Sequence, residues 1–268
     1  MRDGHVHSPF CPHGTKDSFE MYIEKAIDLG YTSISFTEHA PLPSTFDDPT
    51  PEKDSGMNPT YLLDYLEELH RLRKHYEKQI EIEVGLEVDY IEGFEKETTD
   101  FLQTYGPYLT DSILSVHFLK VDHHHICMDF SEHSFAKLIK KVGNLEMLYQ
   151  LYYRTISKAI RANLGSYKPK RLGHLTLIRK FQLQYPRPPM EDQLIMQTLK
   201  EVKNANMALD YNGAGWNKAQ CKETYPSKDI ARKAYQMGIP LIYGSDAHQS
   251  KDLKQGWGQL DTELLPLF

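Results

Sequence analysis

Short runs of β-branched and aliphatic residues alternate along the chain with longer stretches in which apolar residues recur every three or four positions. The short runs are typical of buried strands and the longer stretches of amphipathic helices. The runs predict seven strands, over residues 4–7, 33–37, 80–88, 112–116, 171–175, 207–211 and 239–243. The stretches between them predict helices over residues 18–29, 93–104, 134–142, 145–162, 190–206 and 227–237, and one more that begins at Asn58.

Regular alternation of strands and helices predicts βα units and a parallel sheet. Seven such units in 268 residues favour a closed (β/α) barrel, with an open doubly wound sheet as the alternative. Residues 41–56 are rich in Pro, Asp, Ser and Thr and predict a long loop. No linker or self-similar repeat divides the chain, so we expect one domain over residues 1–268.

Composition narrows the class of protein. The net charge of −6 argues against a protein that binds nucleic acid without regard to sequence, because such proteins usually carry a basic surface. Three cysteines without a Cys-x-x-Cys pair argue against a disulfide scaffold and a structural zinc site. The chain has no apolar run near the ~18 residues of a membrane span, and its N-terminus lacks the apolar core of a signal peptide. We therefore expect a cytoplasmic protein that binds neither membranes nor nucleic acid.

Imidazoles and carboxylates follow the predicted strands at their C-terminal ends. Six of the seven strand ends carry at least one such side chain, and the sixth strand ends in Asn212. The candidates are His5, His7, His13, Glu38, His39, Glu87, His117, His174, Asp246 and His248. Because the active sites of barrels lie at this end of the strands, we expect these side chains to meet in one site.

The residue types predict a metal centre. Neutral imidazole nitrogens together with carboxylate oxygens suit zinc, iron or manganese, whereas calcium and magnesium prefer oxygen ligands alone. His5 and His7 lie on the same side of an extended strand, so both can meet one ion. The candidates outnumber the four or five ligands of a single ion, which predicts two or three divalent ions. The carboxylate of Glu87 could bridge two of them.

The same residues occur as an ordered series of motifs. They are His5-x-His7, His13, Thr37-Glu38-His39, Gly85-Leu86-Glu87, Ser115-Val116-His117, Gly173-His174 and Gly244-Ser245-Asp246-x-His248. This series resembles the PHP (polymerase and histidinol phosphatase) superfamily, and the resemblance covers residues 5–248. It implies a distorted seven-stranded (β/α)7 barrel with a trinuclear metal centre.

The resemblance also implies which residues share an ion. The first ion is expected to take His5, His7, Glu87 and Asp246, the second Glu87, His117 and His174, and the third His13, His39 and His248.

Further segments resemble the histidinol-phosphate phosphatases of this superfamily, namely residues 3–7, 10–14, 173–179, 212–215 and 221–227. This resemblance implies a metal-dependent phosphomonoesterase that cleaves L-histidinol phosphate to L-histidinol and phosphate, a step of histidine biosynthesis. Attack by a metal-bridging hydroxide is the expected mechanism. Another small phosphomonoester is the alternative substrate. A phosphodiesterase or nuclease is the alternative function, and it would need a basic groove lined with aromatic residues.

Three kinds of contact are expected beyond the metal ligands. Arg179 is expected to bind the phosphate, because a planar guanidinium suits two phosphate oxygens. Lys218 stands close to the position where some relatives have an arginine and is expected to supply the missing charge. Asp246 or a histidine beside it, such as His248, is expected to provide the proton of the leaving group.

Two other classes of protein are disfavoured. A metal-dependent amidohydrolase usually needs a carboxylated lysine at a strand end, and none stands out here. A catalytically silent domain tends to lack ligands, whereas every ligand position of the resemblance is filled. Cys11 and Cys221 flank the predicted site loops without the paired base of a nucleophile, so we interpret both as bystanders. Glu38 is interpreted either as a hydrogen-bond partner of a ligand or as a solvated side chain.

Overall fold

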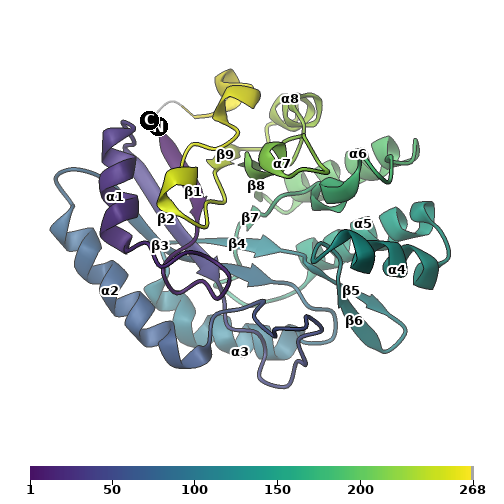
Figure 1. Ribbon diagram of the computed structural model, residues 1–268, viewed down its shortest axis with the longest axis horizontal. Helices are drawn as coiled ribbons and strands as arrows, with labels where there is room; N and C mark the ends of the chain where they lie inside the picture. The colour runs from purple at the N-terminus through teal and green to yellow at the C-terminus, as the bar shows by residue number, and fades with distance from the viewer. Residues whose placement is uncertain (267–268) are drawn as a thin grey trace.

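The computed structural model describes residues 1–266. Seven parallel strands form one sheet in the order β1-β2-β3-β4-β7-β8-β9, which curls into a nearly closed barrel (Figure 1). The strands are β1 Arg2–Val6, β2 Ser33–His39, β3 Glu81–Asp89, β4 Asp111–Ser115, β7 Arg171–Leu172, β8 Ala208–Asn212 and β9 Leu241–Gly244. A separate antiparallel hairpin consists of β5 Phe118–Val121 and β6 His124–Cys127.

Helices cover the outside of the barrel. They are α1 Phe19–Asp28, α2 Leu62–His75, α3 Glu95–Tyr105, α4 Glu132–Val142, α5 Leu145–Arg161, α6 Glu191–Asn204, α7 Ala214–Asn217 and α8 Lys228–Gln236. Short 3-10 helices occupy Pro59–Tyr61, Gly106–Tyr108, Leu177–Phe181, Ser250–Asp252, Trp257–Gln259 and Thr262–Leu264. Among residues 1–266, no helix is both long and apolar enough to cross a membrane.

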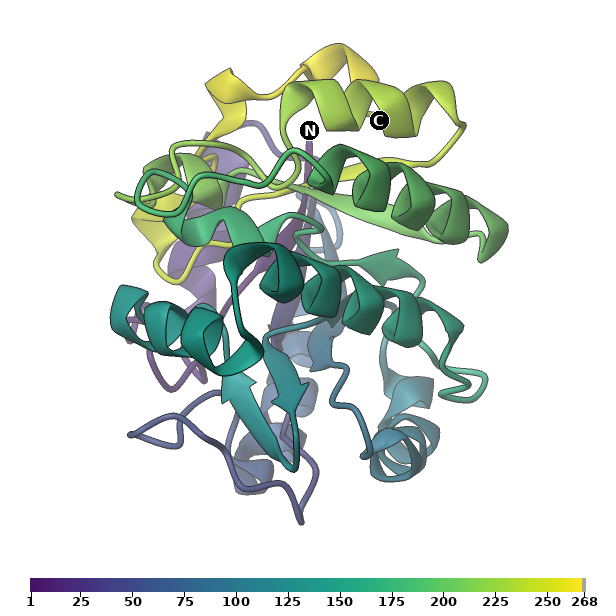
Figure 2. The same ribbon diagram turned by 90° about the vertical axis from the view of Figure 1, so that its right-hand side faces the viewer.

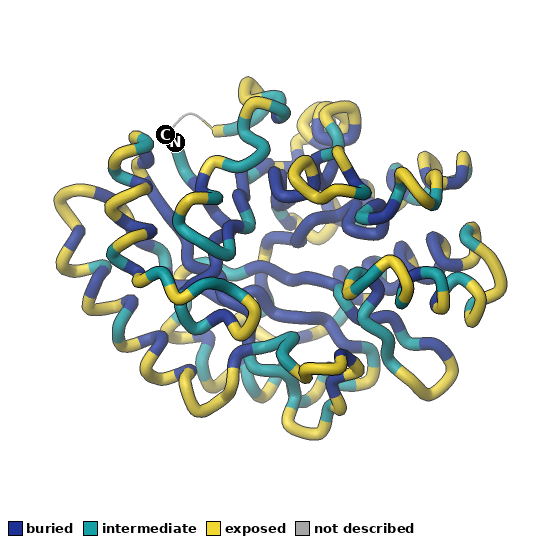
Figure 3. Tube along the Cα trace, in the orientation of Figure 1, coloured by how far each residue is buried: buried dark blue, intermediate teal, exposed yellow. Residues whose placement is uncertain are grey.

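Local sequence signals account for the helix boundaries. Asn144 begins α5 as its N-cap, where its side-chain oxygen accepts from the Met147 amide at 2.9 Å. Ser18 caps α1 in the same way. The barrel strands are mostly buried, while the helices expose their outer faces (Figure 3). The core therefore lies inside the barrel and between the sheet and its helices.

Backbone hydrogen bonds between the first and last strands continue the sheet beyond β1 and β9. The Asp246 amide donates to the His5 carbonyl oxygen at 2.7 Å, and the His7 amide donates to the Ala247 carbonyl oxygen at 3.0 Å. Val6 and Ala247 form a parallel bridge between these two contacts. The closure lies at the carboxyl ends of the strands and brings the two ends of the chain's motif series together.

The seven-stranded α/β barrel expected from the sequence is confirmed, and six of the predicted strands agree with the structure to within two residues at each end. The fifth differs, because β7 contains only Arg171–Leu172. The chain turns away at Gly173, where a Cβ would lie 2.2 Å from the Ser115 Oγ. His174 therefore projects from a turn that leads into the 3-10 helix Leu177–Phe181.

The hairpin β5–β6 was not expected from the sequence. Its turn lacks the Asn-Gly or Asp-Gly pair that usually marks a two-residue hairpin, and Asp122 adopts the positive φ of 57° instead. Figure 2 shows the hairpin next to α4, with α5, α6 and α8 stacked along the same side of the molecule. His125 packs against Phe46 and Phe94, with ring centroids 5.3 and 5.6 Å apart.

Ion pairs around the buried Arg171 hold the amino ends of the strands together. The Arg171 guanidinium crosses the barrel and donates to the Gly4 carbonyl oxygen and to Asp111 Oδ2, each at 2.7 Å. Arg2 also donates to Asp111 Oδ2, at 2.8 Å. Gly4 leaves room for this contact, since a Cβ at that position would lie 2.0 Å from Arg171 Nη1. β1, β4 and β7 are thereby joined through one carboxylate.

The Asp111→Ala variant is expected to lose about 3 kcal/mol of unfolding free energy, because the buried Arg171 would have no counter-charge. Urea denaturation of the variant and the wild type measures this loss. Asp229→Ala is the control, since Asp229 is exposed and pairs loosely with Arg232 at 3.8 Å. Equal stability of the Asp111→Ala variant and the wild type would show that the ion pair does not hold the strands.

Candidate metal centre

The predicted metal ligands lie together at the carboxyl ends of the barrel strands. They come from β1, β2 and β3 and from the segments that follow β1, β4, β7 and β9. The structure gathers all nine candidates, His5, His7, His13, His39, Glu87, His117, His174, Asp246 and His248, around one cavity or directly beneath it.

The rings of His5 and His7 are held in fixed orientations by carboxylates. His5 Nδ1 lies 2.8 Å from Asp210 Oδ2, and His7 Nδ1 lies 3.1 Å from Glu38 Oε1. All four side chains are buried. Each carboxylate accepts the Nδ1 proton, so in the neutral form of each ring the lone pair is on Nε2, the atom that faces the centre of the site.

Glu87 lies at the centre of the cluster. Its Oε1 accepts from Ser115 Oγ at 2.6 Å and lies 2.9 Å from His174 Nε2. Its Oε2 lies 3.1 Å from His39 Nδ1, and 3.5 and 3.7 Å from the Nε2 atoms of His5 and His7, respectively. One carboxylate thus faces imidazoles on both sides, as a bridging ligand requires.

Further contacts position His117 and Asp246. His117 Nδ1 lies 2.9 Å from Asp89 Oδ1, which leaves His117 Nε2 facing Glu87 at 3.8 Å. Asp246 Oδ1 lies 3.3 Å from His7 Nε2, and Asn212 donates to Asp246 Oδ2 at 3.1 Å. The pattern of a carboxylate behind each imidazole therefore occurs three times, at His5, His7 and His117.

Of the histidines of the expected third ion, His39 lies against Glu87, whereas His13 and His248 lie farther from it. His248 stacks on His7, with ring centroids 3.9 Å apart. The His13 ring lies 5.0 Å from that of His39 and 5.2 Å from that of His248, and it is exposed. Its Nδ1 lies 3.2 Å from the Asp54 carbonyl oxygen.

The carboxylates change the protonation of the buried rings. Burial disfavours the charged form of His5, but Asp210, Asp246 and Glu87 outweigh burial and raise its pKa to about 10. Burial is likewise outweighed at His117, where Asp89 raises the pKa to about 10. Both rings are therefore protonated at neutral pH in the metal-free protein. A metal ion must displace these protons, so metal affinity falls as the pH falls.

At neutral pH Asp246 is ionised and His248 is a neutral imidazole. Burial opposes ionisation of Asp246, but the charge of His5 keeps its pKa well below the usual value. Burial and the charge of His7 keep the pKa of His248 well below that of a free imidazole. The lowered pKa values of both side chains suit metal coordination better than donation of a proton to a leaving group.

The residues fit divalent metal ions. His5 Nε2 and His7 Nε2 are buried and have no hydrogen-bond partner, a costly arrangement unless a cation binds there. Potential ligand atoms lie within 4.8 Å of one another in three groups: His5, His7 and Glu87; Glu87, His117 and His174; and His7, Cys11, His39 and His248. The second group contains the three residues expected for the second ion, and the first contains His5, His7 and Glu87 of the first expected set but not Asp246. The third contains Cys11, which the sequence did not suggest.

Arg179 does not occupy the position expected from the sequence. Its guanidinium is buried and donates to both oxygens of Glu191, at 2.8 to 3.1 Å, and to Glu223 at 2.6 Å. The side chain does not line the cavity above the metal ligands. Its hydrogen bonds join the 3-10 helix Leu177–Phe181 to α6 and to the segment before α8, so its donors face structural carboxylates and not the cavity.

Two lysines line the cavity instead. Lys218 does so from an exposed position after α7, as the sequence suggested. Lys180, which the sequence did not suggest, also lines it and donates to Asp129 Oδ2 at 2.9 Å. Burial disfavours the charged form of Lys180, but Asp129 outweighs burial and raises the lysine pKa. The cavity has a volume of about 450 Å³, the size of a small-molecule site.

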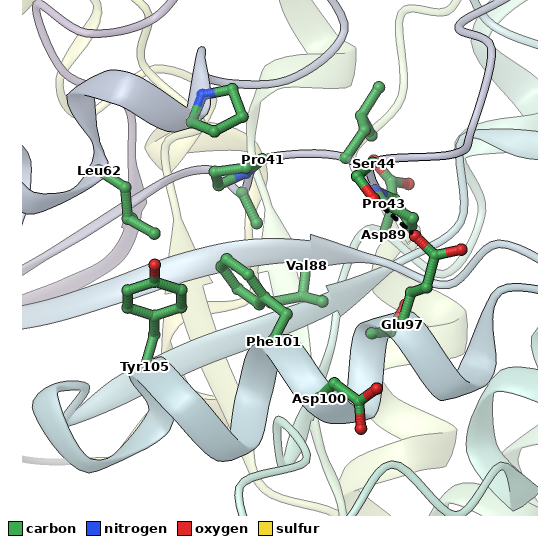
Figure 4. A pocket seen from close by; sticks show the side chains of 14 residues that line it. Pro41, Pro43, Ser44, Leu62, Val88, Asp89, Glu97, Asp100, Phe101 and Tyr105 are labelled. Atoms are coloured by element: carbon green, nitrogen blue, oxygen red, sulfur yellow. Dashed lines mark hydrogen bonds between the residues drawn. The ribbon is translucent and has the colours of Figure 1, made fainter.

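A second cavity lies between residues 40–44 and α3. Phe101 and Tyr105 project from α3 toward Pro41 and Leu62, which makes the walls largely apolar (Figure 4). Its described lining residues include no histidine. The metal-binding side chains therefore belong to the first cavity.

Several carboxylates of the site were missed by the sequence analysis. Asp89 lies two residues beyond Glu87 on β3, and Asp210 lies two residues before Asn212 on β8. Side chains two apart on a strand share a face, and this periodicity could have identified both. Glu38 is a hydrogen-bond partner of His7 and is buried, which decides between its two interpretations.

Comparison with known proteins identifies the family. The PHP domain model matches residues 3–214, so the chain belongs to the PHP domain family. Within that family it is 49% identical over 254 residues to the histidinol-phosphatase of Bacillus subtilis (strain 168), covering 94% of this chain and 95% of the relative. A Deinococcus radiodurans protein named as a probable histidinol-phosphatase is 32% identical over 251 residues, covering 92% of this chain and 86% of the relative.

Two solved structures share the fold. A Listeria monocytogenes protein, provisionally assigned as a histidinol phosphatase, has a TM-score of 0.92 and 36% identity, covering 96% of this chain and 99% of its own. The histidinol phosphate phosphatase of Lactococcus lactis, solved with zinc, L-histidinol and phosphate, has a TM-score of 0.68 and 19% identity, covering 93% and 86%. The second likeness shows the fold alone. The superfamily expected from the motifs is confirmed.

The Asp210→Asn variant is expected to bind metal about 10–100-fold more weakly, because Asn would donate to His5 Nδ1 and place the ring proton on Nε2. Competition with a chromophoric chelator measures the affinity. Asp192→Asn is the matched control, since Asp192 is exposed and pairs with Arg187. Metal binding by Asp210→Asn at wild-type strength would contradict the role of Asp210 in orienting His5.

Proposed function

We propose that this protein hydrolyses L-histidinol phosphate to L-histidinol and phosphate, as a cytoplasmic enzyme of histidine biosynthesis. The observation that supports this substrate is the 49% identity to a histidinol-phosphatase over 94% of the chain. The cluster of imidazoles around Glu87 supports phosphoester hydrolysis independently of that relative. The Lactococcus lactis relative was solved with zinc, L-histidinol and phosphate, the species that this proposal brings together.

The metal ligands have distinct proposed roles. One ion is held by His5, His7, Glu87 and Asp246, a second by Glu87, His117 and His174, and a third by His13, His39 and His248. Divalent zinc, manganese or iron at these positions would neutralise phosphate oxygens and lower the pKa of a coordinated water. Asp210, Glu38 and Asp89 orient the imidazoles that carry out this coordination.

Lys180 and Lys218 are the proposed protein contacts of the phosphate. Lys180 combines a half-buried side chain with a full positive charge, because Asp129 stabilises its ammonium group. An ammonium group in such a partly desolvated cavity attracts a phosphate more strongly than one in bulk water. Lys218 lies on the exposed side of the cavity and would add a second charge.

The segment 41–56 is proposed to face the histidinol part of the substrate. Thr50, Glu52, Asp54 and Ser55 line the cavity from this segment, and Asp252 lines it from beyond β9. Carboxylates at these positions complement the ammonium and imidazole groups of histidinol, which carry donors but no negative charge. The substrate would then lie with its phosphate toward the metal ligands and its amine toward this segment.

The metal-loaded protein is expected to release phosphate from L-histidinol phosphate with kcat/KM above ~10⁴ M⁻¹s⁻¹, the range of ordinary enzymes. A panel of other phosphomonoesters and a phosphodiester should be turned over more slowly. Treatment with a chelator should abolish the activity, and added metal should restore it.

Selective turnover of another monoester would support a phosphatase activity but would exclude L-histidinol phosphate as the substrate. Cleavage of the diester alone would instead favour a phosphodiesterase or nuclease. Activity that survives complete removal of metal, verified by metal analysis, would contradict the proposed chemistry altogether.

The Lys180→Met variant is expected to lose roughly 10–100-fold in kcat/KM, the loss of one hydrogen bond to a charged group. Inhibition by inorganic phosphate should weaken in parallel, because product and substrate share the contact. Lys200→Met, an exposed position on α6, serves as the control. If Lys180→Met lowers kcat while phosphate inhibits it as strongly as the wild type, Lys180 acts through Asp129 and does not bind phosphate.

A further inference from the structure

Cys11 lies inside the cluster of proposed metal ligands. It belongs to the loop between β1 and α1, and its side chain is fully buried. Its Sγ forms a group with one ring nitrogen each of His7, His39 and His248, and these four atoms all lie within 4.8 Å of one another. A buried cysteine that serves only for packing is usually surrounded by apolar side chains, whereas three imidazoles surround this one.

The loop holds this thiol in a defined position. The Cys11 amide donates to the Ser8 carbonyl oxygen at 3.0 Å, and the Ser8 amide and hydroxyl donate to Glu38 Oε2 at 2.8 and 2.6 Å. The carboxylate that orients His7 therefore also anchors the loop that carries Cys11. Gly14 packs directly against the thiol, and a Cβ there would lie 2.9 Å from Cys11 Cβ and 3.3 Å from Sγ.

A second observation points to a cation beside the thiol. His7 Nε2 is fully buried and makes no hydrogen bond. His39 Nδ1 is also buried and has no hydrogen-bond partner, although Glu87 Oε2 lies 3.1 Å from it. Burying such nitrogens without a partner costs free energy, which coordination to an ion would remove. The His13 ring is in contrast exposed, and its Nδ1 lies against the Asp54 carbonyl oxygen. The buried side of this group is thus completed by sulfur.

We propose that Cys11, as a thiolate, is a ligand of the ion held by His39 and His248. The inference rests on the proposed metal centre and is independent of which phosphate ester the enzyme cleaves. The thiol proton is released to solvent when the ion binds. A sulfur ligand makes this position prefer zinc or iron(II) to manganese or magnesium, because soft ligands select softer ions. The cluster would then contain one ion with a sulfur ligand and two ions with only nitrogen and oxygen ligands from the protein.

Substitution with cobalt(II) tests this ligand. The wild-type protein loaded with cobalt should show a thiolate-to-cobalt charge-transfer band in the near ultraviolet together with the weaker visible bands of the metal. Cys11→Ser should lose the charge-transfer band and retain visible bands from the other ions. The zinc affinity of the variant at the position held by His39 and His248 should fall by at least about 100-fold. This is more than is usually lost with a residue that only hydrogen-bonds to a metal ligand, and the manganese affinity should change less.

Cys127→Ser is the matched control. Cys127 lines the same cavity, but its Sγ lies 3.4 Å from Asp129 and outside the imidazole group, so this variant should keep the charge-transfer band.

Three results would overturn the proposal. Wild-type protein that binds cobalt but shows no charge-transfer band has no sulfur ligand, even if the visible bands and the phosphatase activity are intact. A band that persists in Cys11→Ser and disappears in Cys127→Ser assigns the sulfur to the other cysteine. Protein that binds no cobalt at all would refute the metal centre itself, and with it both the proposed function and this ligand.

Discussion

A carboxylate buried at the end of a barrel is strongly unfavourable unless positive charge surrounds it, and Glu87 is such a carboxylate. Imidazoles from β1, β2 and the segments after β4 and β7 approach its two oxygens. These rings meet only if the carboxyl ends of the strands lie side by side at one end of the barrel. The site therefore forms only when the barrel closes. The hydrogen bonds between His5 and Asp246 and between His7 and Ala247 accordingly serve both the sheet and the ligand geometry.

A second layer of carboxylates determines what the imidazoles can do. Asp210, Glu38 and Asp89 each accept from an Nδ1 atom and direct the opposite nitrogen toward Glu87. In the metal-free protein these negative charges are balanced by protons on His5 and His117. Divalent ions would replace those protons with greater positive charge on the same ligand atoms. The carboxylates therefore favour positive charge at the centre of the site, whether protons or metal ions carry it.

Buried cations elsewhere show that residue type alone does not define a role. Arg171 joins three strands through Gly4 and Asp111 at the amino ends of the barrel, and Arg179 joins distant segments through Glu191 and Glu223. Arg179 donates from all three of its guanidinium nitrogens to structural carboxylates, and Arg171 donates from Nη2 to Gly4 and Asp111. Lys180 is paired with a single carboxylate and faces the cavity, so its ammonium group can also meet an anion. Whether a buried cation can bind an anion therefore depends on how many carboxylates already pair with it and on whether it faces a cavity.

The sequence by itself determined the seven strands, the parallel barrel and the metal-ligand candidates at the strand ends, because alternation of buried strands and amphipathic helices is a local pattern. Its ordered motifs also identified the superfamily. The tertiary structure alone decided which side chains stand behind those ligands, since Asp210 and His5 are 205 residues apart and meet only when the barrel closes. For the same reason the sequence did not show that Arg179 pairs with Glu191 and Glu223, that Lys180 lines the cavity, or that Cys11 lies among imidazoles. Hydrophobic periodicity places a side chain on a face, but its partners depend on packing between segments distant in the chain.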